Sequence, residues 1–224
     1  MGNFKIISFM DLMQCGSPNV ATAQQNSCVT QEPQVPSNGV YIQDVNHKLW
    51  KIEDWDDSVK PNAIAVISGS IKFLVALTQR SSTMQLGSRY CEPIENHMAE
   101  TSSLIAAKTD YDGVGNTAKI LQVQPSATYA AGYCDSFVFP DGKTKGYLPS
   151  LGQLRLAFQN KTNIDAALSK CGGTAMSTEY YWSSTFRGLY DIYRRFWTLY
   201  WNDGMVSFNG LSSSHYVRPF ANFN

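Results

Sequence analysis

The sequence predicts an α+β fold, in which antiparallel hairpins lie near both ends of the domain and short helices lie between them. Three observations carry this prediction. Apolar runs at 63–67 and 71–77 flank a Ser-Gly-Ser turn, an arrangement typical of a hairpin. Residues 151–171 instead carry apolar side chains at helical spacing. Alternating runs return at 196–201 and 205–209, on either side of an Asn-Asp-Gly turn signal.

Composition limits the classes of function open to the chain. Its 224 residues suit one large domain, or one domain with a small companion. The 18 basic and 18 acidic residues give zero formal net charge, which argues against nucleic acid as a partner. The five cysteines lack a C-x-x-C spacing and the three histidines are widely separated, so no zinc or redox motif is predicted. We therefore expect no catalytic residue, no metal and no cofactor.

Residues 1–37 are predicted to form a polar arm, because they contain proline and glutamine without a sustained period. The first 15 residues imitate a signal peptide only briefly. Asp11 interrupts the apolar stretch, and the residues before Cys15 are not the small ones of a cleavage site. The longest other apolar run is too short to span a bilayer. We expect neither an export signal nor membrane insertion.

The β-rich portion that follows predicts two hairpins. The first joins residues 40–42 to 48–50, and the second joins 63–67 to 71–77. The near-continuous apolar runs of the second hairpin predict strands that are covered on both faces. Trp55 lies between the hairpins with three aspartates, which we interpret as solvated loop carboxylates rather than a cation site.

Two helices are predicted before residue 135. Residues 110–116 resemble the beginning of a calcium loop but lack its downstream acidic ligand. We interpret them as a tight turn before a helix at 118–123, capped by Asn116 or Thr117. A second helix is expected at 127–134.

Two further helices are better marked. Ser150 and Gln153 have the spacing of a capping box. Leu151, Leu154 and Phe158 then repeat on one buried helical face. A shorter helix at 164–171 is stopped by a glycine pair.

The C-terminal hairpin predicts two faces of different character. Alternation places Trp197, Leu199 and Trp201 on an apolar face, in either of the two turn registers that the sequence allows. The opposite face holds side chains that can form hydrogen bonds: Thr198, Tyr200, Asn202, Ser207 and Asn209. That face is either the solvated side of a sheet or a recognition surface. The preceding segment at 186–193, which we expect to be a loop, crowds large apolar groups together and favours a contact surface or a loop folded under the domain.

Several short motifs together resemble a known fold family. They are Leu-Pro-Ser at 148–150, Tyr-Trp-Ser-Ser-Thr at 181–185, Asn-Asp-Gly at 202–204 and Tyr-Val-Arg-Pro-Phe at 216–220, with weaker matches at 112–117 and 130–134. As a set, they are similar to the C-type lectin fold of bacterial and phage proteins. The chain most resembles the variable proteins of diversity-generating retroelements, found in Bacteroides-like gut bacteria and their phages. The resemblance covers residues 110–220, is loose at 38–109 and does not extend to 1–37.

The resemblance implies a C-type-lectin-fold domain at 38–224, with a β-rich portion at 38–109 and a ligand-display portion at 110–224. An antiparallel sheet with C-terminal hairpins and two or more short helices would then form a fixed scaffold. The implied scaffold residues are Trp182, Ser183, Ser184, Trp197, Leu199, Trp201, Gly204, Val206, Val217, Arg218 and Pro219. The implied ligand-binding residues are Phe186, Arg187, Leu189, Tyr190, Asp191, Tyr193, Thr198, Tyr200, Asn202, Ser207, Asn209, Ser214 and His215.

By this resemblance the chain is a ligand-binding protein and not an enzyme. Its diversified surface would recognise a macromolecule, either a protein or a surface glycan, at a phage tail or a bacterial cell surface. A homo-oligomer is left open. Three alternatives stay open as well: a non-diversified adhesion or carbohydrate-binding module, a calcium-dependent lectin suggested by Trp-Asn-Asp at 201–203, and an enzyme suggested by fold kinship alone.

Overall fold

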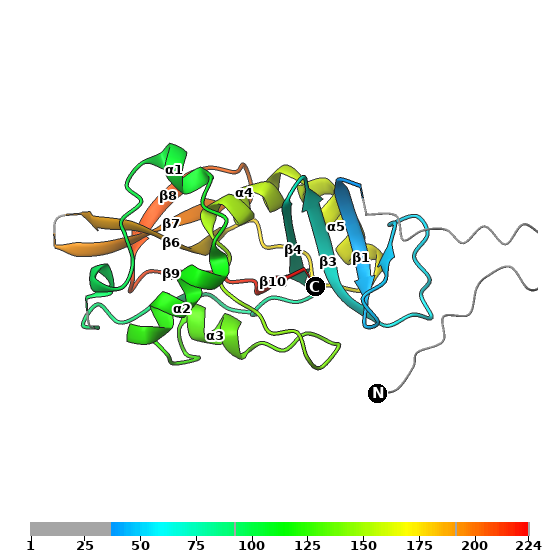
Figure 1. The fold of residues 1–224 in the computed structure, drawn as a ribbon, viewed down its shortest axis with the longest axis horizontal. Helices are drawn as coiled ribbons and strands as arrows, with labels where there is room; N and C mark the ends of the chain where they lie inside the picture. Colours follow the sequence, from blue (N-terminus) through cyan, green and yellow to red (C-terminus); the bar gives the residue numbers. More distant parts are fainter. Residues whose placement is uncertain (1–36, 92, 191, 224) are drawn as a thin grey trace, which may run out of the picture. The chain divides into compact units, whose positions relative to one another are not determined.

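The computed structural model describes residues 37–91, 93–190 and 192–223, all within the unit Pro36–Asn224. The structure is α+β, with antiparallel sheets and short helices (Figure 1). The predicted arm at 1–37 lies outside the described residues, except for Ser37.

Five strands form the first sheet, in the order β10-β4-β3-β1-β2. Both predicted N-terminal hairpins are present, and the six inner residues of β3 are buried, as its apolar run predicted. The Asp44 carboxylate holds the first turn, because it accepts hydrogen bonds from the Asn46 and Lys48 amides and from the Trp50 indole. The strands are β1 (Gly39–Asp44), β2 (Leu49–Trp50), β3 (Pro61–Ser68), β4 (Ile71–Ala76) and β10 (Phe220–Asn222).

Strand β10 brings the C-terminus back to the first sheet. Phe220 pairs with Val75 of β4, and its ring stacks on Phe73 with centroids 5.0 Å apart. A single apolar cluster therefore includes residues from both 38–109 and 110–224.

The predicted helices are present, but three of them begin at other residues than expected, and the one expected from 164 begins at Lys161. Helix α2 starts earlier, because Asp112 is its N-cap and accepts a hydrogen bond from the Gly115 amide at 2.8 Å. Helix α3 starts later, because Ser126 binds the Thr128 amide in a turn instead of capping the helix. The capping box of Ser150 and Gln153 is confirmed. The helices are α1 (Leu104–Lys108), α2 (Gly113–Val123), α3 (Ala130–Ser136), α4 (Leu151–Gln159), α5 (Lys161–Lys170) and the short 3-10 helix η1 (Ile94–Asn96).

A second sheet lies between two groups of helices. Its strands are β6 (Tyr180–Tyr190), β7 (Tyr193–Tyr200) and β8 (Val206–Gly210), in that order, and a separate pair joins β5 (Met84–Gln85) to β9 (Ser214–His215). Figure 1 shows α1 and α4 on one side of this sheet and α2 and α3 on the other. Each side carries its own apolar cluster, so the sheet is packed on both faces.

Arg218 joins segments that are far apart in the sequence. Its guanidinium is buried and donates hydrogen bonds to the carbonyl oxygens of Ala76, Thr174 and Ala175, at 3.3, 2.5 and 3.4 Å. Burial lowers the pKa of Arg218 to about 10, so the side chain still carries its charge near neutral pH. Within the described residues no carboxylate forms an ion pair with it, and three backbone dipoles supply the compensation.

Arg218→Met is expected to lower the free energy of unfolding by about 3 kcal/mol or more, since it leaves three carbonyl groups without their donor. Guanidinium-induced unfolding followed by tryptophan fluorescence measures the change. Lys143→Met removes an exposed positive charge and serves as the control, with an expected loss below about 0.5 kcal/mol. Similar losses for the two variants would contradict a structural role for Arg218.

Candidate ligand-binding surface

The segment at 186–193, expected to be a loop, is the distal part of a long β6–β7 hairpin. Phe186 pairs with Phe196 and Tyr190 pairs with Tyr193, with register shifts on either side of residue 186. Gly188 lies in this irregular stretch with φ of 115°, where a Cβ would meet the Glu100 side chain at 2.5 Å. The loop prediction was wrong because the bulge hides the period of two that the strand otherwise has.

The second hairpin, between β7 and β8, has one of the two registers that the sequence allows, with Asn202 and Asp203 at the centre of the turn. Trp197 lies opposite Phe208 and Leu199 opposite Val206. Gly204 has φ of 78°, and the Met205 amide donates to the Asp203 carboxylate at 2.8 Å. Asp203 thus stabilises the turn, the role that the Asn-Asp-Gly signal predicts.

The apolar face is confirmed as core. Trp197 packs edge-on against Phe208 at 5.7 Å and donates its indole hydrogen to the Thr101 carbonyl at 2.8 Å. Trp201 is fully buried and packs edge-on against Phe158 of α4 at 5.6 Å. Leu199 belongs to the same cluster. These side chains fix the sheet to the helices on one side.

The opposite face is not all solvated, and two expected ligand-binding residues are buried. Phe186 packs against Phe196 at 5.2 Å, inside the cluster that includes Trp182. Thr198 is fully buried, and its hydroxyl oxygen accepts a hydrogen bond from the Asn209 amide at 3.1 Å. Alternation identified this face correctly, but it carried no information about the helices that cover its centre.

The predicted ligand-binding residues that are not buried lie toward the ends of the part of the sheet that the helices cover. At the tip of the β6–β7 hairpin Leu189, Tyr190 and Tyr193 are 43%, 49% and 48% exposed. Asn202 and Ser214 are exposed as well, and Asp191 lies outside the described residues. The remaining predicted positions are half-buried: Arg187, Tyr200, Ser207, Asn209 and His215.

Tyr200 and His215 belong to an aromatic stack away from the tip. The Tyr180 ring lies 4.8 Å from that of Tyr200 and 5.6 Å from that of His215, and His215 also packs edge-on against Trp182 at 4.6 Å. The Nε2 atom of His215 is buried without a hydrogen-bond partner in the described chain. Burial lowers the pKa of His215 to about 4, so the imidazole is neutral at physiological pH. His215 is therefore a half-buried member of the stack, with its Nε2 atom inside.

Arginines gather around the hairpin tip, and the sequence reasoning singled out only one of them. Arg187 lies over the Phe208 ring, 4.4 Å from its centroid, and Arg195 lies 5.4 Å from the centroid of Tyr193. Arg194 points to the other side of the sheet and binds both carboxylate oxygens of Glu95 at 2.7 and 3.2 Å. Hydrogen bonding to Arg194 lowers the pKa of Glu95, so this ion pair holds η1 against β7.

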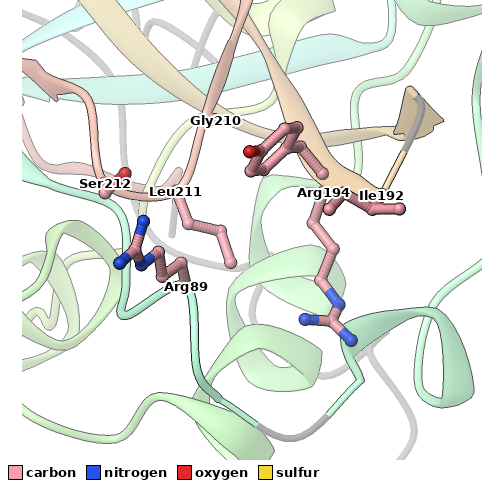
Figure 2. Close-up of a pocket in the computed structure, with 7 residues that line it drawn as sticks. Arg89, Ile192, Arg194, Gly210, Leu211 and Ser212 are labelled. Carbon is pink, nitrogen blue, oxygen red and sulfur yellow. The ribbon is translucent and has the colours of Figure 1, made fainter.

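Two of the hollows that the described residues line are small. One, of about 80 Å³, lies beside the hairpin, with Arg89 and Arg194 among its lining residues (Figure 2). The other, of about 260 Å³, lies beside α2 and is lined in part by Leu121, Lys145 and Tyr147.

Among the described residues there is no group of three or more His, Cys, Asp or Glu placed to hold a metal ion. Nor does the described chain contain a helix long and apolar enough to cross a membrane.

In comparisons with known proteins, no family model matches the chain, and no curated protein or solved structure matches it either. Function is therefore argued from the geometry of the hairpin surface.

Trp197→Ala is expected to lower the free energy of unfolding by about 3–5 kcal/mol, because it removes a buried aromatic side chain. Tyr200→Ala removes a half-buried ring that packs on Tyr180, and about 1 kcal/mol is expected. Chemical denaturation of both variants gives the comparison. Equal losses would mean that Tyr200 is part of the core.

The stability of the domain is expected to fall as the pH drops from about 6.5 toward 4. In this window His215 of the unfolded chain, with an ordinary pKa near 6.5, binds a proton that the folded state with its pKa of about 4 excludes. The contribution of the neutral His215 to stability is therefore fully present above about pH 6.5. His215→Phe, measured by thermal unfolding from pH 4 to 7, should show a weaker pH dependence than the wild type. An unchanged profile would rule out His215 as the cause.

Proposed function

We propose that this protein binds a macromolecular ligand through a diversified surface displayed on a C-type lectin scaffold, as the variable proteins of diversity-generating retroelements do. The observation that carries the proposal is the exposure of large side chains at the tip of the β6–β7 hairpin. Leu189, Tyr190 and Tyr193 lie outside both apolar clusters, on strands whose inner residues are fixed. Tyrosine suits recognition because it buries much area while few torsions are frozen.

The burial of the motif residues supports the division between scaffold and display. Trp182 donates its indole hydrogen to the Met84 carbonyl at 2.8 Å, and the Ser183 hydroxyl donates to the Trp197 carbonyl at 2.7 Å. Arg218 is held by three carbonyl groups. Substitutions at these positions would disturb the core, whereas substitutions at the hairpin tip would change mainly what the surface contacts.

A macromolecular ligand suits large side chains that stand exposed at a hairpin tip. The two hollows described above, at about 80 and 260 Å³, are smaller than the roughly 300–1,000 Å³ of pockets that enclose small ligands. A protein or a surface glycan instead meets an exposed surface. We place the protein at a phage tail or a bacterial cell surface, where such partners occur, and we propose no catalytic role and no cofactor.

The diversification claim is tested in the genome and in the population. A template copy of the region that encodes the hairpins and a reverse-transcriptase gene are expected near the coding sequence. Sequencing the gene from many individual genomes should find substitutions concentrated at the codons for exposed residues such as Tyr190 and Tyr193, with Trp182 and Trp197 constant. A complete genome that lacks both the template copy and the reverse-transcriptase gene would contradict diversification. It would favour a non-diversified adhesion module of the same structure.

The binding claim is tested with the double variant Tyr190→Ala/Tyr193→Ala. Binding of the fluorescently labelled protein to a panel of intact bacterial strains, measured by flow cytometry, is expected to weaken by about tenfold or more. The unfolding temperature should stay within about 2 °C of the wild type, because both rings are about half exposed. Val138→Ala, at an exposed apolar residue outside the hairpin, is the control. Wild-type binding by the double variant would contradict the proposed surface.

A further inference from the structure

Two arginines from different strands lean toward the same edge strand. Arg187 belongs to β6, but its guanidinium carbon lies 4.4 Å above the ring of Phe208 on β8. Arg195 belongs to β7, and its Nη1 atom lies 3.2 Å from the position that a Cβ on Gly210 of β8 would take. Phe208 and Gly210 are two residues apart on one face of β8, a spacing of about 7 Å. Both positive charges therefore lie above neighbouring positions of β8.

Glycines leave Arg195 uncovered by its neighbours in the sheet. Its cross-strand partners are Gly188 on β6 and Gly210 on β8. A side chain at Gly210 would meet the guanidinium, and at Gly188 the backbone has φ of 115°, which disfavours other residues. The sequence thus keeps space for Arg195 on β8, whereas the Glu100 side chain fills the space over Gly188.

Neither arginine has an acidic partner within the described chain. Arg187 and Arg195 form no ion pair and donate no hydrogen bond there, and the Nε atom of each is buried without an acceptor. Arg194, next to Arg195, is by contrast held by Glu95. Glu100 lies along β6, but its carboxylate accepts the Leu189 amide at 3.1 Å. A guanidinium donates through five hydrogens, and leaving the buried Nε–H of each arginine without an acceptor is costly.

Within the part of the chain that the structure describes, the same strand has a free edge. In the three-stranded sheet β8 pairs with β7 on one side only. The Tyr200 amide donates to the Met205 carbonyl at 2.8 Å, which places the hydrogen-bonded pairs of the ladder at Thr198–Ser207 and Phe196–Asn209. The N–H and C=O groups of Val206 and Phe208 consequently point to the outer edge, and no described backbone group binds them.

We propose that this edge binds an extended acidic segment of a partner protein, which adds a strand beside β8 and places carboxylates on Arg187 and Arg195. Strand addition supplies main-chain hydrogen bonds to Val206 and Phe208, and the side chains supply specificity. Every second residue of the added strand points to the face that carries the arginines. The repeat of about 7 Å between such residues equals the spacing of Phe208 and Gly210, so a segment with alternating carboxylates fits both charges.

The inference names the partner class for the surface in the proposed function, and it rests on that function only in taking the hairpin surface as a binding surface. A short acidic strand satisfies two features of the site together, the unpaired charges and the unpaired edge. A globular anion or a single phosphate group would satisfy only the first.

The test uses a fluorescein-labelled peptide of about ten residues in which Glu and Thr alternate, with binding to the full chain measured by fluorescence anisotropy. One control peptide has Gln in place of Glu. A second keeps the carboxylates but carries N-methyl groups on alternate residues, which block pairing with a strand edge. Each control peptide is expected to bind about tenfold more weakly than the Glu-Thr peptide.

Arg187→Gln and Arg195→Gln should each weaken binding of the Glu-Thr peptide by about tenfold and reduce its salt dependence. Lys72→Gln, which removes one positive charge from the other sheet, is the matched control and should bind within about twofold of the wild type. Unfolding temperatures of all three variants check that the fold is intact.

Four results would overturn the inference. If the N-methylated peptide bound as tightly as the Glu-Thr peptide, strand addition would be contradicted. If the arginine variants bound the Glu-Thr peptide as tightly as the wild type, the charge contact would be contradicted. Dimerisation of the wild-type chain in sedimentation experiments, abolished by Val206→Pro, would assign the edge to a second copy of the protein. Failure of the peptide to bind while cell binding still depends on Tyr190 and Tyr193 would overturn this inference alone and leave the proposed function standing.

Discussion

The burial of sheet β6–β8 on both faces is the constraint on which the rest of this structure depends. Trp197 and Trp201 pack toward α4 on one side, and Trp182 packs toward α2 and α3 on the other. A strand held in this way cannot move without opening a core, so its free end is displayed in a fixed orientation. The exposed tyrosines at the hairpin tip then lose little freedom on binding, which favours recognition of a partner.

Polar groups inside the domain connect the helices to this sheet. The carboxylate of Asp110 accepts hydrogen bonds from Asn116 on α2 at 2.8 Å and from Thr185 on β6 at 2.6 Å. Its backbone carbonyl accepts the Ser150 hydroxyl at the start of α4 at 2.7 Å. A segment whose composition resembles a calcium loop therefore acts as a junction of three elements, with each oxygen matched to a donor as buried polar groups require.

Arginine serves three purposes in this chain, and its surroundings decide which. Arg218 is buried and stabilises the core through carbonyl groups. Arg194 is partly buried and fixes η1 through a bidentate ion pair with Glu95. Arg187 and Arg195 lie on aromatic rings with no acidic partner in the described chain, which leaves their charge available to a ligand. A chain with zero formal net charge can thus still present a local positive site.

The sequence by itself determined both N-terminal hairpins, the β7–β8 hairpin, the capping box at Ser150 and the core role of Trp197 and Trp201, because each depends on neighbours a few residues away. It could not determine that Thr198 is buried, since alternation gives the direction of a side chain but not what packs over it. The helices and the β5 strand that cover that face come from distant parts of the chain. Only the tertiary structure decided that Arg195 stands between two glycines, because this requires the register of three strands, set by a bulge and a turn that local propensity does not specify.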